Sequence, residues 1–191
     1  VNGNLIFSHA DTAMNGNRLP VSITHYYNSC DSDKDEFGMG YGWRTSLHQT
    51  LHKVLYNGEV EFVYTDGDGT EHFFKKNKDD QKKYSDQSGL SLTLEVGDEN
   101  VTITDKGDNG MTFPLVSDTP TEDAPETGKA LIQKIQDAVG NEVTVTALAD
   151  SPLKIASVTD GANRVTTLHY TDGRCDRIQT PWQNENSCVR F

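Results

Sequence analysis

Short runs of alternating apolar and polar residues recur along the 191-residue chain, and tight clusters of Gly, Asn and Asp separate them. In the run 90–96, Leu92, Leu94 and Val96 alternate with Ser, Thr and Glu. A period of two gives a β-strand one apolar and one polar face, and the clusters between the runs have the composition of hairpin turns. No segment carries a helical period. The sequence therefore predicts an all-β fold of antiparallel hairpins in an extended or sandwich-like sheet.

Twelve of these runs are long enough to predict strands, and two of the clusters between them predict specific turns. Asn57-Gly58 supplies the two positive φ angles of a type I′ hairpin, and Asp66-Gly67-Asp68-Gly69 has the composition of a similar turn. The polar stretch 75–88 reads as a long hairpin tip. The expected strands are 4–9, 21–27, 43–56, 59–65, 70–74, 90–96, 101–104, 111–116, 131–136, 142–148, 154–159 and 164–170.

Composition divides the chain into three segments. The segment 117–129 contains two prolines and four carboxylates but no aromatic residue, so it buries too little apolar area to order itself. We expect an N-terminal β-sheet region over 1–116, an acidic linker or loop over 117–129, and β-hairpin repeats over 130–191. Within the last segment, 131–145 resembles 154–167 at a displacement of 22 or 23 residues, and a third unit begins at Tyr170. A single hairpin cannot bury its apolar face alone, so such units must stack on neighbours.

The overall charge excludes one class of partner. Seventeen basic and 29 acidic residues give a net charge of −12, whereas nucleic-acid binding requires an excess of Lys and Arg. No run approaches the roughly 18 apolar residues of a membrane span. The chain begins with Val1 and runs directly into patterned sequence, which we interpret as a segment of a longer polypeptide.

The three cysteines do not form an obvious framework. Cys175 and Cys188 could form a disulfide across neighbouring strands if the protein is exported, and free thiols are the alternative. Cys30 has no obvious partner.

The sequence resembles a known family at several places. Tyr170-Thr-Asp-Gly-Arg174, followed by Arg177-Ile178 and Pro181, resembles the YD repeats of the Rhs/teneurin-related family. The N-terminal half resembles the segment that precedes those repeats in bacterial Rhs and wall-associated proteins. The matching blocks are 3–5 with Asp11, 19–23, 27–29, 37–43 and 64–69.

This resemblance implies a large secreted or cell-surface protein whose hairpins wind into a hollow β-shell, often around a variable C-terminal toxin. The chain would form the start of that shell, and its partners would be the rest of its own polypeptide and a cell-surface protein or polysaccharide. Trp182, Cys175 and Cys188 depart from the usual repeat pattern. The family's autoproteolytic site lies near the far end of the long protein, so no catalytic residue is carried over. We therefore expect a structural or adhesive module.

A carbohydrate-binding module is the alternative, because exposed aromatic rings stack on sugars. The candidate contacts are Tyr41, Trp43 and Trp182. For Trp43, which follows Gly40-Tyr-Gly42, a role as a buried anchor is the stronger interpretation, since large aromatic side chains bury well.

Catalytic and metal chemistry find little support in the sequence. Six histidines occur, but none lies in a recognisable catalytic frame. His48 and His52 would be about 13 Å apart on one strand at roughly 3.3 Å per residue, which is too far for one ion, so we interpret them as surface or sheet-face residues. The acidic run Asp31–Glu36 begins like a calcium loop but lacks its Gly and its final Glu, so a solvated loop is the better interpretation. We expect no enzyme activity, metal site or cofactor.

Overall fold

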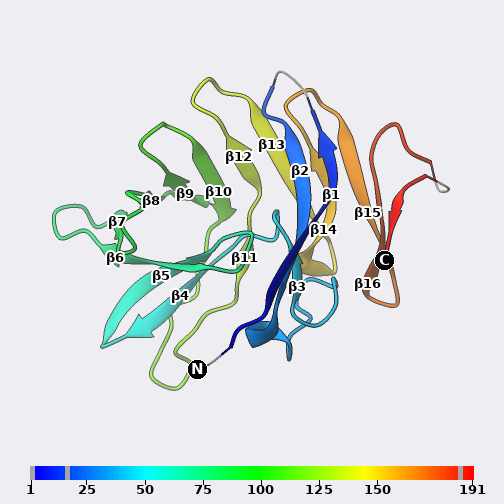
Figure 1. Cartoon of the computed structure of the whole chain (residues 1–191). Helices are drawn as coiled ribbons and strands as arrows, with labels where there is room; N and C mark the ends of the chain where they lie inside the picture. The colour runs from blue at the N-terminus through cyan, green and yellow to red at the C-terminus, as the bar shows by residue number, and fades with distance from the viewer. Residues whose placement is uncertain (1–2, 16–17, 185–186) are drawn as a thin grey trace. The chain divides into compact units, whose positions relative to one another are not determined.

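The computed structural model describes residues 3–15, 18–184 and 187–191, and their regular structure is almost entirely β (Figure 1). This confirms the predicted all-β class. One 3-10 helix, η1 (Ser29–Asp31), accompanies the strands. In chain order the described strands are β1 (Ile6–Met14), β2 (Val21–Asn28), β3 (Trp43–Thr45), β4 (Thr50–Tyr56), β5 (Glu59–Thr65), β6 (Glu71–Lys76), β7 (Lys83–Asp86), β8 (Thr93–Val96), β9 (Asn100–Thr104), β10 (Gly110–Pro114), β11 (Ala130–Leu131), β12 (Lys134–Gln136), β13 (Glu142–Leu148), β14 (Ser151–Thr159), β15 (Val165–Thr171), β16 (Arg174–Gln179) and β17 (Val189–Arg190).

The chain divides into two compact units, which are described separately. Unit 1 comprises Val1–His48, Gly67–Gly69 and Asn141–Phe191, and unit 2 comprises Gln49–Asp66 and Thr70–Gly140. These units bring together residues that are distant in sequence, so they follow different boundaries from the three segments expected from composition. Those segments stay a prediction about organisation along the chain.

Unit 2 is a series of antiparallel strands in the order β11-β4-β5-β6-β7-β8-β9-β10-β12. Apolar side chains of its inner face are fully buried, among them Phe62, Phe74 and Phe113. The Phe62 ring meets that of Tyr84 at a centroid distance of 4.9 Å, and the Tyr64 ring meets that of Phe113 at 5.9 Å. Because Tyr64 lies in β5 and Phe113 in β10, the second contact means that this sheet curls around its own core.

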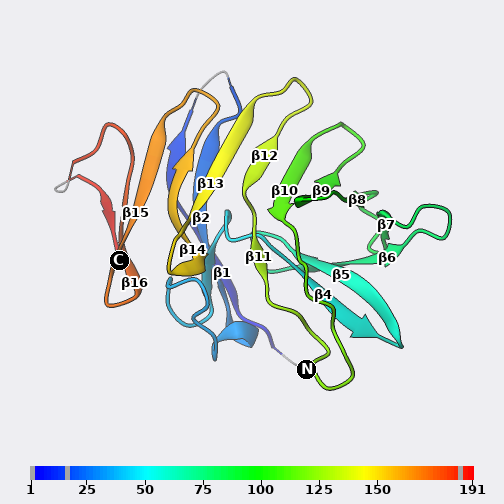
Figure 2. The ribbon, with the colours of Figure 1, turned by 180° about the vertical axis from the view of Figure 1, so that it is seen from behind.

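Unit 1 contains the three-stranded sheet β1-β2-β3 and the stretch β13-β14-β15-β16-β17 of a 14-stranded sheet. Figure 2 shows β13, β14 and β15 side by side, and each pairs antiparallel with the next. The two sheets meet through their inner faces: the Thr166 hydroxyl contacts the Met14 sulfur at 3.1 Å, and Arg164 donates to the Asn15 carbonyl at 3.0 Å. Unit 1 is therefore a two-layered β-sandwich.

Three predicted elements differ from the structure. The strand expected over 131–136 is two short strands, β11, which pairs with β4, and β12, which pairs with β10. The strand expected over 43–56 is two strands, because the chain turns between them: the His48 N–H donates to the Thr45 carbonyl at 2.9 Å, and the Thr45 N–H donates to His48 Nδ1 at 3.0 Å. The prediction that His48 and His52 share one strand is therefore wrong. The expected hairpin tip at 75–88 contains a further strand, β7, which pairs with β6 and β8.

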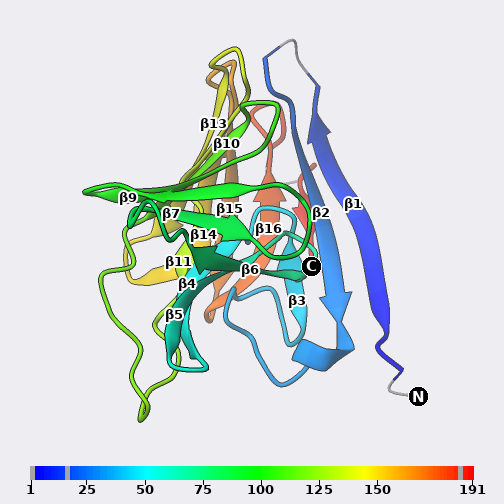
Figure 3. The same ribbon diagram turned by 90° about the vertical axis from the view of Figure 1, so that its left-hand side faces the viewer.

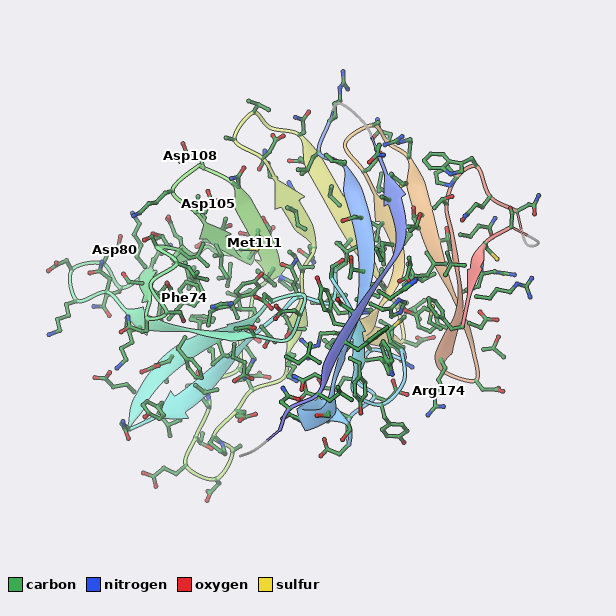
Figure 4. The ribbon with its side chains drawn as sticks, viewed as in Figure 1. Phe74, Asp80, Asp105, Asp108, Met111 and Arg174 are labelled. Carbon is green, nitrogen blue, oxygen red and sulfur yellow. The ribbon has the colours of Figure 1, made fainter. Side chains whose placement is uncertain are left out.

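One turn geometry recurs between strands. An Asp begins the turn and its carboxylate accepts backbone N–H bonds from residues two and four positions later, while the residue three positions later has a positive φ. At Asp105, for example, Oδ1 accepts from Gly107 at 2.7 Å and from Asn109 at 3.0 Å, and Asp108 has φ 61° (Figure 4). Turns that begin with Asp and have a positive φ three residues later start at Asp66, Asp86, Asp105, Asp137 and Asp160.

Two-residue turns complete the hairpins. Asn57 and Gly58 have φ values of 50° and 80° between β4 and β5, and Asp172 and Gly173 have 50° and 82° between β15 and β16. The predicted Asn57-Gly58 turn is confirmed. Positive φ at both positions is the signature of the I′ turn, which Asn, Asp and Gly adopt most readily.

The acidic segment 117–129 contains no strand or helix in the structure and runs beside β4. The Leu55 N–H donates to the Pro125 carbonyl at 2.8 Å, and the Thr127 N–H donates to the Lys53 carbonyl at 3.0 Å. Backbone hydrogen bonds to an existing strand therefore order a segment that has little apolar surface to bury.

Asp160 is the turn residue whose loss should be most damaging. It is 2% exposed, and its carboxylate accepts from the Ala162 N–H, the Arg164 N–H and the Arg164 guanidinium. Replacing Asp160 with Ala leaves buried donors unpaired, so we expect Asp160→Ala to lower the free energy of unfolding by about 2–3 kcal/mol. Urea unfolding followed by tryptophan fluorescence measures this, since Trp43 and Trp182 both lie in unit 1.

The matched control is Asp172→Asn, because Asn tolerates the same positive φ in the two-residue turn. We expect it to leave the unfolding midpoint nearly unchanged. Equal losses in the two variants would contradict the role given to the Asp160 carboxylate.

Candidate functional site

Strand pairing gathers aromatic rings on the inner face of the first sheet in unit 1. Phe7 pairs with Tyr27, and Tyr27 pairs with Trp43, so the three side chains lie in one row across β1, β2 and β3. The centroid of the Trp43 ring lies 5.2 Å from that of the Tyr27 ring and 6.1 Å from that of the Phe7 ring. His25, one step along β2, places its ring 6.2 Å from Trp43 and 4.4 Å from Phe191. We call Phe7, His25, Tyr27, Trp43 and Phe191 the aromatic cluster.

The aromatic cluster is only partly covered. Phe7 is 53% exposed and Phe191 is 56% exposed, while Tyr27 and Trp43 are half-buried and His25 is buried. Most of its rings thus combine contacts within the cluster with a face open to solvent. Such a surface can take the apolar face of a sugar ring or of an extended peptide.

Two glycines just before β3, Gly40 and Gly42, allow the chain to approach the aromatic cluster closely. A Cβ on Gly42, which has φ 76°, would lie 2.8 Å from the Asn28 carbonyl oxygen and 3.0 Å from the Tyr27 ring. Only glycine fits this close approach with this φ. The sequence Gly40-Tyr41-Gly42 before Trp43 therefore lets the chain bring Trp43 against Tyr27.

The three predicted sugar contacts lie in three different settings. Trp43 belongs to the aromatic cluster, whereas Tyr41 is 56% exposed beneath the Arg174 guanidinium and Trp182 is 60% exposed beneath that of Arg164. The distances from these guanidinium carbons to the ring centroids are 5.4 Å and 5.5 Å. Within the described residues no ring contact joins the three aromatic side chains. Their role in sugar binding stays a prediction.

Both arginines are held by carboxylates. Arg174, labelled in Figure 4, donates to Asp35 at 3.3 Å, and Arg164 donates to the buried Asp160 at 2.6 Å. The arrangement therefore offers neutralised guanidinium groups over exposed rings, which suits a neutral ligand better than an anionic one.

A buried carboxylate lies beside the aromatic cluster, and sequence reasoning missed it. Asp11 occupies the bulge that shifts the β1–β2 register between Ala10 and Thr12. Its side chain is almost fully buried and contacts the Nδ1 atoms of two histidines, His25 in a very short contact and the exposed His9 at 3.1 Å. His25 Nε2 is buried without a hydrogen-bond partner. Asp is uncommon within strands, and the strand expected over 4–9 ends before Asp11, whereas β1 continues to Met14.

His48 is fully buried and lies outside the strands, so its interpretation as a surface or sheet-face residue is wrong. His52 is a buried residue of β4 and therefore lies on a sheet face. The His48 ring packs 4.6 Å from that of Phe37. Burial lowers the pKa of His48 from 6.5 to about 3, and the charges of Arg44 and His25 act in the same direction. Because Nδ1 accepts the Thr45 N–H, the ring is neutral with its proton on Nε2. It serves as a structural hydrogen-bond acceptor in the 45–48 turn.

Cysteine and carboxylate groups elsewhere in unit 1 have structural partners. Cys175 is a buried thiol, so the candidate disulfide with Cys188 is not formed, and burial raises its pKa to about 11. Asp31 pairs with Arg44 at 3.7 Å, and Asp35 accepts from the Gly40 N–H at 3.0 Å. Among the described residues no group of three His, Cys, Asp or Glu side chains is arranged to hold a metal ion.

Comparison with known proteins adds one match. Residues 1–74 match a family described as a domain of unknown function, DUF6531. The matched residues include β1 to β5 and most of the aromatic cluster. A search of characterised proteins finds no match. In the described part of the chain, no helix is both long and apolar enough to cross a membrane.

The neutral, buried His48 makes unit 1 sensitive to acid. In the unfolded chain the imidazole binds a proton near pH 6.5, but in the folded chain it does so only near pH 3. The stability that the neutral His48 ring contributes is therefore fully present above pH 6.5 and is lost as the pH falls toward 3. The loss at pH 5 is about 2 kcal/mol in the free energy of unfolding. Urea unfolding at pH 7 and pH 5 measures the loss. In His48→Asn, which keeps an acceptor for the Thr45 N–H but does not titrate, the loss should be smaller by that amount, and an unchanged pH dependence would contradict the assignment.

Trp43 should matter for stability more than the other tryptophan. We expect Trp43→Ala to cost about 2 kcal/mol, below the 3–5 kcal/mol typical of a fully buried ring, because Trp43 is half-buried. Trp43→Phe should recover part of the loss. Trp182→Ala is the control and should change stability by less than about 0.5 kcal/mol, as is usual for exposed positions. Circular dichroism during urea unfolding reports all three, and a Trp182→Ala loss as large as that of Trp43→Ala would contradict the packing role of the aromatic cluster.

Proposed function

We propose that this chain is a structural and adhesive module of a large secreted or cell-surface bacterial protein of the Rhs/YD-repeat type. In this proposal it forms the start of a β-shell, and its exposed faces contact surface partners. The proposal has no catalytic step, and it places the hairpin series of unit 1 in the role of scaffold.

The observation that carries the proposal is the hairpin series β13 to β17. Each strand pairs antiparallel with the next. The β14–β15 and β15–β16 turns begin at Asp160 and Asp172, and they place Asn163 and Gly173 at a positive φ. The sequence that resembles a YD repeat, Tyr170-Thr-Asp-Gly-Arg174, forms the β15–β16 hairpin. An architecture of repeated hairpins buries its apolar faces only by stacking, which suits a scaffold better than a pocket enzyme.

The loop that contains Gly38 lies in close contact with these hairpins, and this contact supports the same proposal. The Cys175 N–H donates to the Gly38 carbonyl at 2.7 Å, and a Cβ on Gly38 would lie 2.7 Å from the Gly173 carbonyl oxygen. Gly38 belongs to one of the sequence blocks that resemble the segment preceding YD repeats. In this proposal that segment caps the first hairpins of the shell.

Carbohydrate binding is the second candidate, and the exposed rings of Tyr41 and Trp182 favour it. Each ring presents one face beside a guanidinium that a carboxylate already neutralises. Stacking on a neutral sugar would use the ring faces, with nearby polar groups as hydrogen-bond partners.

Affinity electrophoresis through gels containing neutral polysaccharides separates the two candidates. For the scaffold we expect the wild-type chain to migrate equally with and without polysaccharide. Retardation that disappears in Trp182→Ala or Tyr41→Ala, with folding intact, would overturn the scaffold role in favour of carbohydrate binding. The expected surface location is checked by antibody labelling of intact cells that produce the full parent protein. Labelling that requires permeabilised cells would contradict that location.

A further inference from the structure

Strand β1 is an unusual sheet edge. It is nine residues long and ends the three-stranded sheet of unit 1, with its outer side at the margin of that sheet (Figure 3). The strands at other sheet ends are short: β3 has three residues, and β11 and β17 have two each. Proteins protect long edges with Lys, Pro or an inward charge. The stretch 6–10 of β1 has none of these, and all five of its residues are exposed.

The register shows which backbone groups face outward. The Ser29 N–H donates to the Leu5 carbonyl at 3.0 Å, so Leu5 and Ser29 form a hydrogen-bonded pair. Hydrogen-bonded pairs alternate in an antiparallel ladder, so Phe7 and His9 also direct their backbone groups toward β2. The N–H and C=O groups of Ile6, Ser8 and Ala10 therefore point away from β2, along the edge.

These outward groups are symmetric about Ser8. If a second β1 lies antiparallel with Ser8 opposite Ser8, then Ile6 of each copy faces Ala10 of the other, and each of these pairs exchanges both backbone hydrogen bonds. On the inner face, Phe7 of each copy lies opposite His9 of the other. A two-fold interface requires this kind of self-complementarity.

We propose that the 6–10 edge of β1 pairs with the same edge of a second copy of this chain. The side chains from Leu5 to Ala10 include no Asp, Glu, Lys or Arg, so no like charges meet at the two-fold axis despite the net charge of −12. The bulge at Asp11 ends the regular edge at Ala10, and the paired segment is therefore the exposed segment. This pairing does not depend on the proposed scaffold function.

The proposed contact between the two β1 strands involves few residues, so the association is weak. Five residues a side is far below the roughly 20–30 residues a side of a stable interface, so the dimer is transient in solution. It should populate only at high protein concentration, or where many copies are held close together and the effective concentration is high.

Sedimentation equilibrium over a concentration series up to about 1 mM, a level comparable to the effective concentration of tethered partners, tests the pairing. We expect the weight-average mass of the chain to rise from the monomer value of 21.1 kDa toward twice that value. Ser8→Pro removes an outward N–H that β2 does not use, and it should return the chain to monomer without changing its circular dichroism. Ser8→Thr is the matched control and should still associate. A wild-type chain that stays monomeric throughout, or a dimer that persists in folded Ser8→Pro, would overturn the proposal.

Cysteine crosslinking tests the register independently. In a Cys30→Ser background, Ser8→Cys places two thiols opposite each other at a Cα separation of about 5.5 Å, within the range that a disulfide spans. We expect Ser8→Cys to form a crosslinked dimer under mild oxidation at least tenfold faster than Ser22→Cys, which lies on the exposed face of β2. Equal crosslinking at the two positions would show that association uses another surface and would overturn the proposal.

Discussion

The hydrogen bonds that an Asp carboxylate accepts are the interactions on which five of the hairpin turns in this chain depend. Each hairpin must reverse the backbone within a few residues and still satisfy the amides that no strand partner reaches. Asp105 does this with Gly107 and Asn109, and Asp160 does it with Ala162 and Arg164. A residue with positive φ then returns the chain to the next strand. Part of the acidic composition thus serves to form turns.

Two carboxylates show how location changes the consequence of the same chemistry. Burial alone would raise the pKa of Asp160, but the Arg164 side chain and the backbone N–H groups of Arg164 and Ala162 hold it below its ordinary value, so the buried group stays ionised. Asp11 instead lies within a strand, at a bulge, and contacts His9 and His25. Asp11 therefore serves no turn, and its carboxylate lies buried beside the half-exposed rings of the aromatic cluster.

Local chemistry made much of the fold predictable, and long-range packing limited the rest. The turn at Asn57-Gly58, the hairpins after Asp66 and the all-β class follow from alternation and turn residues, which act within a few positions. The break at 46–49 does not, because the Thr45 and His48 contacts that create it occur in a run whose residues also suit a continuous strand. Burial of His48 depends on Phe37, which lies 11 residues earlier, and the pairing of Asp11 with His25 depends on the register of β1 against β2. Neither leaves a periodic signal.

Phe7 joins the candidate site to the unprotected edge of β1. Its backbone groups bond toward β2, while its ring contacts Trp43 and remains half exposed. A strand added at the outward groups of Ile6 and Ser8 would place its own side chains beside that ring, because neighbouring strands put opposed side chains about 4.5–5.5 Å apart. The exposed ring of Phe7 and the open edge of β1 are therefore neighbours, and an occupant of the edge would reduce the exposure of Phe7. The exposure of Phe7 then follows from the same feature as the incomplete pairing of the strand.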